Sequence, residues 1–208
     1  MRTSRASANG ALFVGLLGLL SCNQAPGTGQ ISLRLKDAAG DVQAAVVTIS
    51  EINLQGSGGT TLLNQGQPPL TQDLVLLQPP NNPTVLVEGL AVPAGTYTQL
   101  RFVLTGAYIQ VDNGDGTSSI YASSPEYATA HGVEATGSLQ MPSMGESGLK
   151  VILPGNALTV PDGADVCLTA DFDVSQSFGH LAGGSGQWVM HPVIKGEIAT
   201  GDCGGQPS

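Results

Sequence analysis

Basic and aromatic residues are both scarce in this 208-residue chain. Seven Lys and Arg residues stand against sixteen Asp and Glu, which gives a formal net charge of −9 at pH 7. Only 4% of the residues are Phe, Trp or Tyr. A surface this acidic repels phosphate backbones, so the composition argues against nucleic acid as a partner. The shortage of aromatic rings argues against the long substrate cleft of a glycosidase.

Recognisable catalytic motifs are also missing. No Gly-x-Ser-x-Gly segment is present. The nearest segment, Gly145-Glu146-Ser147-Gly148, is one residue too short. It also comes before a strand pattern, whereas a nucleophile elbow comes directly after a strand. The chain has neither a phosphate-binding Gly-Lys-Ser/Thr loop nor a dinucleotide fingerprint. Its three histidines have no metal-binding spacing. We therefore predict that the protein is not an enzyme.

The apolar run at the N-terminus is too short to cross a membrane as a helix. Ala11 to Leu20 form ten apolar residues that follow Arg2 and Arg5, as in the core of a signal peptide. The run ends in Leu19-Leu20-Ser21-Cys22, which resembles the lipobox of bacterial lipoproteins. In that family the leader is cut before the cysteine, and the thiol is acylated.

The lipobox resemblance implies a lipoprotein signal peptide over residues 1–21 and lipidation of Cys22. Residues 22–29 then form the acylated cysteine and a flexible tether. The protein would be anchored in the cell envelope, at the outer membrane or the outer face of the inner membrane. An ordinary secretory leader with Cys22 near its cleavage site is the alternative.

The remaining two cysteines suit an exported protein. If Cys22 carries lipid, Cys167 and Cys203 are left as a pair in an oxidising compartment. We predict a disulfide between them, closing a loop of about 36 residues. A metal pair or two free thiols are the alternatives.

Short strands separated by turns dominate the rest of the chain. Ile31, Leu33 and Leu35 alternate with polar residues, as in a strand with one buried face. A change of phase between Ala45 and Leu54 predicts a β-bulge near Ser50-Glu51. Residues 122–147 have no clear period, so we expect mostly loop there, with Ser124-Pro125-Glu126 as one candidate helix start. These patterns predict a single antiparallel, all-β sandwich of about nine or ten strands over residues 30–203, followed by a tail at 204–208.

Several segments, taken in order, resemble the domain-of-unknown-function family 4382 of prokaryotic lipoproteins and secreted proteins. They are Ser32-Leu33-Arg34-Leu35-Lys36-Asp37-Ala38, Val46-Val47-Thr48-Ile49, Thr71-Gln72-Asp73-Leu74-Val75-Leu76, Val92-Pro93-Ala94-Gly95-Thr96-Tyr97, Ser147-Gly148-Leu149-Lys150, Asp171-Phe172-Asp173 and His191-Pro192-Val193-Ile194. The resemblance implies a β-sandwich broadly like transthyretin or immunoglobulin domains. It implies no activity and carries no catalytic residues.

Two pairs of carboxylates are candidate ligands for a metal. Asp171 and Asp173 are two apart in a strand pattern and would project from one face, as half of a calcium site or as a glycosidase acid and base. Asp112 and Asp115 lie in a Gly-rich segment that superficially resembles a calcium loop. The ordinary interpretations are a solvated strand face and a hairpin turn.

We thus predict a lipid-anchored β-sandwich of the cell envelope that acts as a binding or structural module without a cofactor. Its partners would be the membrane, through the lipid, and an envelope protein or glycan bound at a sheet face or at loops such as 122–147 and 179–187. The alternative is a calcium-stabilised surface adhesion domain using the four aspartates. A hydrolase or carbohydrate-active enzyme is the least favoured hypothesis.

Overall fold

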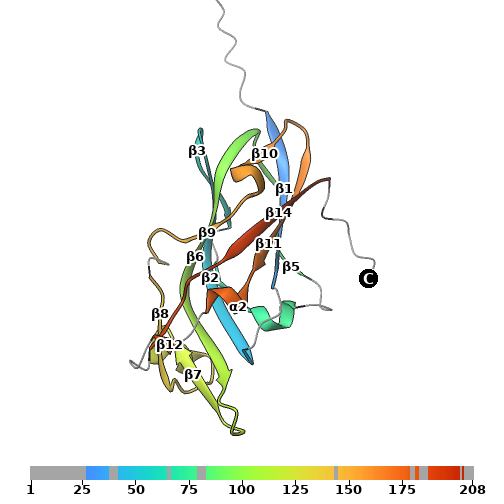
Figure 1. Ribbon diagram of the computed structural model, residues 1–208. Helices are drawn as coiled ribbons and strands as arrows, with labels where there is room; N and C mark the ends of the chain where they lie inside the picture. The colour runs from blue at the N-terminus through green and yellow to red at the C-terminus, as the bar shows by residue number, and fades with distance from the viewer. Residues whose placement is uncertain are drawn as a thin grey trace, which may run out of the picture.

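The computed structural model describes residues 27–37, 42–64, 67–78, 83–142, 145–178, 181–182, 187–201 and 203. Within them the chain forms two β-sheets that pack against each other, together with four short helices (Figure 1). No helix in these ranges is long and apolar enough to cross a membrane. The prediction of an all-β sandwich is confirmed.

The two sheets differ in size. The small sheet has four strands in the order β14–β11–β1–β5. These are β1 (Thr28–Lys36), β5 (Thr84–Pro93), β11 (Asp165–Phe172) and β14 (Ile194–Thr200). The large sheet has ten strands, in the order β12–β13–β8–β7–β6–β2–β3, with β9 and β10 paired to β6 and β4 paired to β2. These are β2 (Ala44–Gly56), β3 (Gly59–Asn64), β4 (Leu70–Asp73), β6 (Gly95–Asp112), β7 (Ser118–Ala122), β8 (Gly137–Gln140), β9 (Leu149–Val151), β10 (Leu158–Val160), β12 (Leu181–Ala182) and β13 (Gln187–Val189). The helices are η1 (Leu74–Leu77), α1 (Pro125–Ala130), η2 (Pro154–Asn156) and α2 (Val174–Ser177).

Three strand pairs are parallel, so the predicted purely antiparallel pairing is wrong. Strand β1 runs parallel to β11, and β8 runs parallel to both β7 and β13. Side-chain alternation has a period of two whichever way the neighbouring strand runs, so it does not reveal direction. The described residues also hold fourteen strands where nine or ten were expected. Several of the observed strands have only two or three residues, such as β9, β10 and β12.

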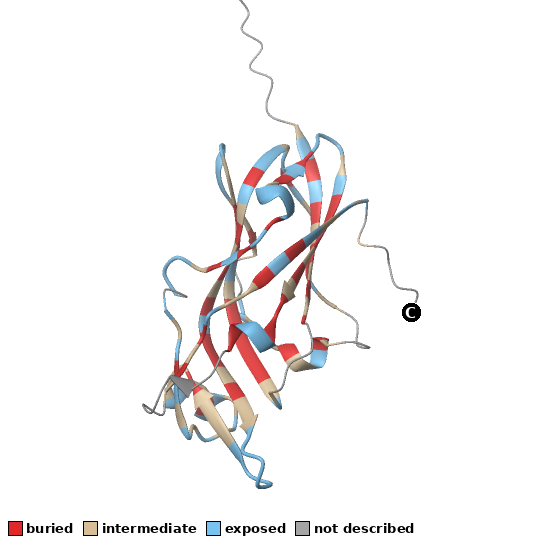
Figure 2. Cartoon of the chain, in the orientation of Figure 1, coloured by how far each residue is buried: buried red, intermediate tan, exposed pale blue. Residues whose placement is uncertain are grey.

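The core lies between the two sheets, and the strands bury alternate residues there (Figure 2). In β1 the side chains of Ile31, Leu33 and Leu35 are buried, whereas the intervening polar residues are not. The register between β2 and β6 shifts both before and after Ile49. Ser50 has no paired residue in β6, and the pairing resumes at Glu51. The predicted bulge near Ser50-Glu51 is confirmed.

Helix α1 covers part of the outer face of the large sheet, in the region expected to be mostly loop. The Ser124 hydroxyl accepts a hydrogen bond from the Tyr127 amide at 3.1 Å and caps the helix. The Tyr127 hydroxyl lies 2.7 Å from Thr48 Oγ1. A Cβ on Gly106 would come within 2.2 Å of the Tyr127 ring, so only glycine fits beneath it. This contact explains why Thr48 is buried although it faces away from the core.

Candidate functional site

The outer face of the small sheet gathers polar side chains along two neighbouring strands. Because Ile31, Leu33 and Leu35 point into the core, the intervening residues of β1 point outward. The parallel register places Gln30 beside Asp165, Ser32 beside Cys167 and Arg34 beside Thr169. The pairing therefore builds a polar face from two segments that are more than a hundred residues apart in sequence.

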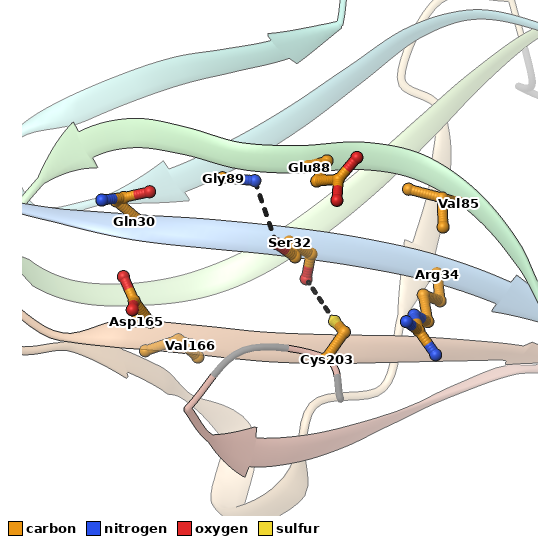
Figure 3. Close-up of a pocket in the computed structure, with 9 residues that line it drawn as sticks. All are labelled: Gln30, Ser32, Arg34, Val85, Glu88, Gly89, Asp165, Val166 and Cys203. Atoms are coloured by element: carbon orange, nitrogen blue, oxygen red, sulfur yellow. Dashed lines mark hydrogen bonds between the residues drawn. The ribbon is translucent and has the colours of Figure 1, made fainter. Parts of the chain in front are cut away.

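A hollow of about 290 Å³ lies on this face (Figure 3). We call it the trough, and its lining residues are Gln30, Ser32, Arg34, Val85, Glu88, Gly89, Asp165, Val166 and Cys203. Arg34 stands at one end, Gln30 and Asp165 stand at the other, and Ser32 lies between them (Figure 3). Arg34 and Gln30 are four residues apart on β1, a span of about 13 Å in a strand.

A bulge in β5 opens one side of the trough. Ile31 pairs with Leu90 and Leu33 pairs with Val87, so the single residue Ser32 faces both Glu88 and Gly89. An extra residue of this kind bends its strand locally. Gly89 has a φ of +54°, and its amide donates to Ser32 Oγ at 2.9 Å. The bend exposes Glu88 at the edge of the trough.

A disulfide forms the opposite wall. Cys167 on β11 is joined to Cys203, with 4.9 Å between their Cα atoms. The sulfur of Cys203 lies 3.7 Å from the carbonyl oxygen of Ser32 (Figure 3). The segment after β14 is thus tied across β11 to the centre of the sheet.

Most of the chain matches a known sequence family. The family described as domain of unknown function DUF4382 matches residues 28–192. The chain belongs to the DUF4382 family. The match confirms the resemblance predicted from the sequence, and it contains every trough residue except Cys203. No curated protein and no solved structure shows a significant match to the chain.

The few basic residues of this DUF4382 chain concentrate on the same outer face. Five basic residues follow residue 21, and three of them, Arg34, Lys36 and Lys195, lie there. Lys36 Nζ is 2.8 Å from Glu197 and 3.5 Å from Asp171, and its hydrogen bond to Glu197 is the main cause that raises the pKa of Lys36. The trough thus shares the outer face of the small sheet with a group of closely spaced charges of both signs.

The residues proposed for calcium do not come together in the described part of the DUF4382 domain. There, no group of three or more His, Cys, Asp or Glu side chains is arranged to hold a metal ion. Asp112 Oδ1 accepts from the Gly114 amide at 2.8 Å, and Asp115 Oδ1 accepts from the Thr117 amide at 2.9 Å. The hydrogen bonds from Thr117 also lower the pKa of Asp115. These carboxylates shape the turn between β6 and β7.

The predicted placement of Asp171 and Asp173 on one strand is wrong for Asp173. Strand β11 ends at Phe172, and Asp173 caps α2 by accepting from the Gln176 amide at 3.1 Å. Burial by itself raises the pKa of Asp173, but hydrogen bonds from Ser175 and Gln176 and the charge of Lys195 hold it below its usual value. The alternation of polar and apolar residues in β11 extends one residue beyond the end of the strand, because the aspartate that caps α2 happens to fall at the next polar position. The sequence pattern therefore does not show where the strand ends. Cys22 lies outside the described residues.

Sequence reasoning missed Asp37, a buried carboxyl at the end of β1. Its side chain accepts from Gln78 Nε2 at 2.9 Å and from the Val174 amide at 3.0 Å, and only 2% of the residue is exposed. Burial raises the pKa of Asp37 to about 6, against the opposing effect of these two hydrogen bonds. Asp37 was noticed only as part of the family resemblance, because a polar residue at the end of a strand pattern is usually solvated.

Proposed function

We propose that this DUF4382 chain is a lipid-anchored protein of the cell envelope that binds a small polar ligand in the trough. The observation that carries the proposal is the convergence of Arg34, Glu88 and Asp165 around one hollow, in a chain with few charged residues. Small-molecule sites are concave and use a few placed polar groups beside apolar surface. Val85, half exposed, and the disulfide supply the apolar part.

The lipobox-like segment supports the location. Strand β1 begins at Thr28, six residues after Cys22. A fully extended chain of six residues spans about 20 Å. The trough is lined from the first strand, at Gln30, Ser32 and Arg34. An acyl chain on Cys22 would therefore hold the trough within a few nanometres of the bilayer, at the outer membrane or the outer face of the inner membrane.

Replacing Cys22 tests the anchor. The full chain, expressed in a bacterium that processes lipoproteins, should partition into the detergent phase and begin at acylated Cys22, whereas Cys22→Ala should partition into the aqueous phase. Two or more acyl chains, at about 0.8 kcal/mol per buried methylene, make such an anchor effectively permanent. Mass spectrometry of the N-terminal peptide identifies the modification, and Ser21→Ala, which keeps a small residue before the cysteine, is the control. An unmodified chain that still begins at Met1 would contradict the anchoring proposal.

Thermal unfolding with a panel of small solutes tests the binding proposal. The panel contains basic, acidic and neutral amino acids, neutral hexoses, hexuronates and amino sugars. At least one class should raise Tm, because a ligand at a hundredfold excess over Kd stabilises the native state by about 2.7 kcal/mol. Arg34→Gln should abolish the shift, whereas Lys150→Gln, which removes an exposed cation of β9 outside the trough, should retain it. If the ligand raised the Tm of Arg34→Gln as much as that of the wild type, the ligand would bind outside the trough.

A further inference from the structure

Two basic residues face each other on the outer face of the large sheet. Arg101 on β6 is paired with Lys150 on β9. The residues next to them along each strand are buried in the core, so both basic side chains point outward. Residues directly opposite in an antiparallel pair have Cβ atoms about 4.5–5.5 Å apart, and like charges at that distance are destabilising. The juxtaposition is unusual in a chain with sixteen acidic and seven basic residues.

No carboxylate neutralises this pair within the part of the chain that the structure describes. Neither Arg101 nor Lys150 is in an ion pair there. Arg101 does have hydrogen-bond partners, since its Nε donates to Gln99 Oε1 at 2.8 Å and its Nη1 donates to the carbonyl oxygen of Ser147. Both acceptors are neutral. They fix the position of the guanidinium and leave its positive charge next to Lys150.

The two sides of the pair differ. On the β2 side, Asn53 is the residue paired with Arg101. The carboxylate of Glu51, two residues earlier in β2, accepts a hydrogen bond from Asn53 Nδ2 at 3.4 Å. Lys150 lies on the other side, at β9. An anion therefore meets the two cations without a neighbouring carboxylate only if it approaches from the β9 side.

A hollow of about 460 Å³ opens on that side, next to Lys150. Strand β6 pairs with β10 up to Tyr97 and with β9 from Leu100 onward. Between these two pairings, the chain that connects β9 to β10 leaves the sheet and forms the short helix η2 (Figure 1). Its departure uncovers Thr98 and Gln99. The residues that line the hollow are Thr98, Gln99, Lys150, Ile152, Leu153 and Asn156.

The lining combines one charge with uncharged polar groups. Lys150 is the only charged residue among the lining residues, all of which belong to the described chain. Thr98 adds a hydroxyl, and Gln99 and Asn156 add two amides. Hydroxyl and amide groups both donate and accept hydrogen bonds, as the hydroxyls of a sugar do. Ile152, 55% exposed, adds apolar surface, and the volume is that of a small-molecule site.

We propose that this hollow binds an acidic sugar, whose acid group lies beside Lys150 and Arg101. The sugar hydroxyls contact Thr98, Gln99 and Asn156. The acid is a carboxylate or a phosphate, because both accept charge-assisted hydrogen bonds from ammonium and guanidinium groups. The hollow lies on the large sheet and the trough on the small one, so this inference does not rest on the function proposed for the trough.

Titrations of the full-length protein in uncharged detergent micelles test the proposal, with the side-chain amide NMR signals of Gln99 and Asn156 as the readout. The probes are D-glucuronate, D-glucose 6-phosphate, D-glucose, which lacks the acid, and acetate, which lacks the hydroxyls. At low ionic strength at least one acidic sugar should bind about tenfold more tightly than glucose and than acetate, which is the effect of one charge-assisted hydrogen bond. The tighter acidic sugar identifies the acid group.

Substitutions of the two cations make the result specific. Lys150→Gln should bind the acidic sugar and glucose within about twofold of each other. Arg101→Gln should lower the preference severalfold, and Arg101→Lys, which keeps the charge, should retain most of it. Lys195→Gln removes a basic residue of β14, on the other sheet, and is the matched control that should bind like the wild type.

The thermal unfolding midpoint of each variant is measured without ligand. Lys150→Gln should not lower Tm, because it removes a repulsion between like charges, so its loss of binding is not a loss of folding. The same variant separates the two proposed sites. A solute whose binding depends on Arg34 lies in the trough, and one whose binding depends on Lys150 lies in this hollow.

Four results would overturn the proposal. Equal affinity of the wild type for glucose and for both acidic sugars excludes the acid group as the feature recognised. Acetate that binds as tightly as the acidic sugars excludes the sugar. Binding of the acidic sugar that is unchanged in Lys150→Gln places the ligand outside the hollow. If no probe shifts the amide signals of Gln99 and Asn156, the hollow is not a site for this class of ligand.

Discussion

Replacing Cys167 and Cys203 together by alanine is expected to lower the free energy of unfolding by about 3–4 kcal/mol. The two cysteines are 36 residues apart, and the disulfide that joins them restricts the unfolded chain over this loop. The loop contains most of β11 and all of α2, β12, β13 and β14. Urea unfolding monitored by Trp188 fluorescence measures the change, since the indole is buried in the native state.

Reduction of the wild-type protein is the matched test of this effect. Without reductant the wild type should be more stable than Cys167→Ala/Cys203→Ala, and with dithiothreitol the two should unfold at nearly the same urea concentration. The double variant should not respond to dithiothreitol. Equal stability of the two proteins under oxidising conditions would show that the bond contributes nothing to the fold.

Asp37 should make the protein less stable as the pH rises from about 4 to about 6. Its pKa is about 6 in the folded chain against 3.8 for the free carboxyl, so within this window the native state binds more protons than the unfolded state. The free energy of unfolding then falls with rising pH, by an amount on the order of 3 kcal/mol from this group. Above pH 6 the carboxylate is charged in both states, and the effect of this group levels off.

The contribution of Asp37 is isolated by comparison with Asp37→Asn. Urea unfolding at several pH values should show the decline in wild type and in Glu134→Gln, which removes an exposed carboxylate far from Asp37 in the sequence, and little or none of it in Asp37→Asn. Asp37→Ala leaves the Val174 amide without its partner and should cost about 1–3 kcal/mol throughout. If the free energy of unfolding fell equally with pH in wild type and in Asp37→Asn, the decline would come from groups other than Asp37.

Strand patterns could be predicted where one face of a strand is buried over several residues. Ile31, Leu33 and Leu35 on β1 alternate because the core excludes water from one side of the sheet only. The same reasoning identified the bulge near Ser50, where the buried phase shifts. It missed the direction of β11 relative to β1, because alternation is the same in parallel and antiparallel pairs.

The candidate site was harder to predict, because its residues come from distant segments. Arg34, Glu88 and Asp165 are each ordinary polar residues of a strand pattern, and no spacing connects them. Of the aspartates singled out in the sequence, Asp112 and Asp115 shape a turn and Asp173 caps α2, whereas Asp171 forms an ion pair with Lys36.

Local chemistry along the chain was thus enough to predict the all-β class, the buried face of β1, the bulge in β2 and the family resemblance, because each depends on neighbours within a few residues. The trough, the burial of Asp37 and the pairing of β1 with β11 depend on which strands meet, and that is decided by packing of the two sheets around a shared core. Such contacts join residues more than a hundred positions apart, and no short segment of the sequence records them.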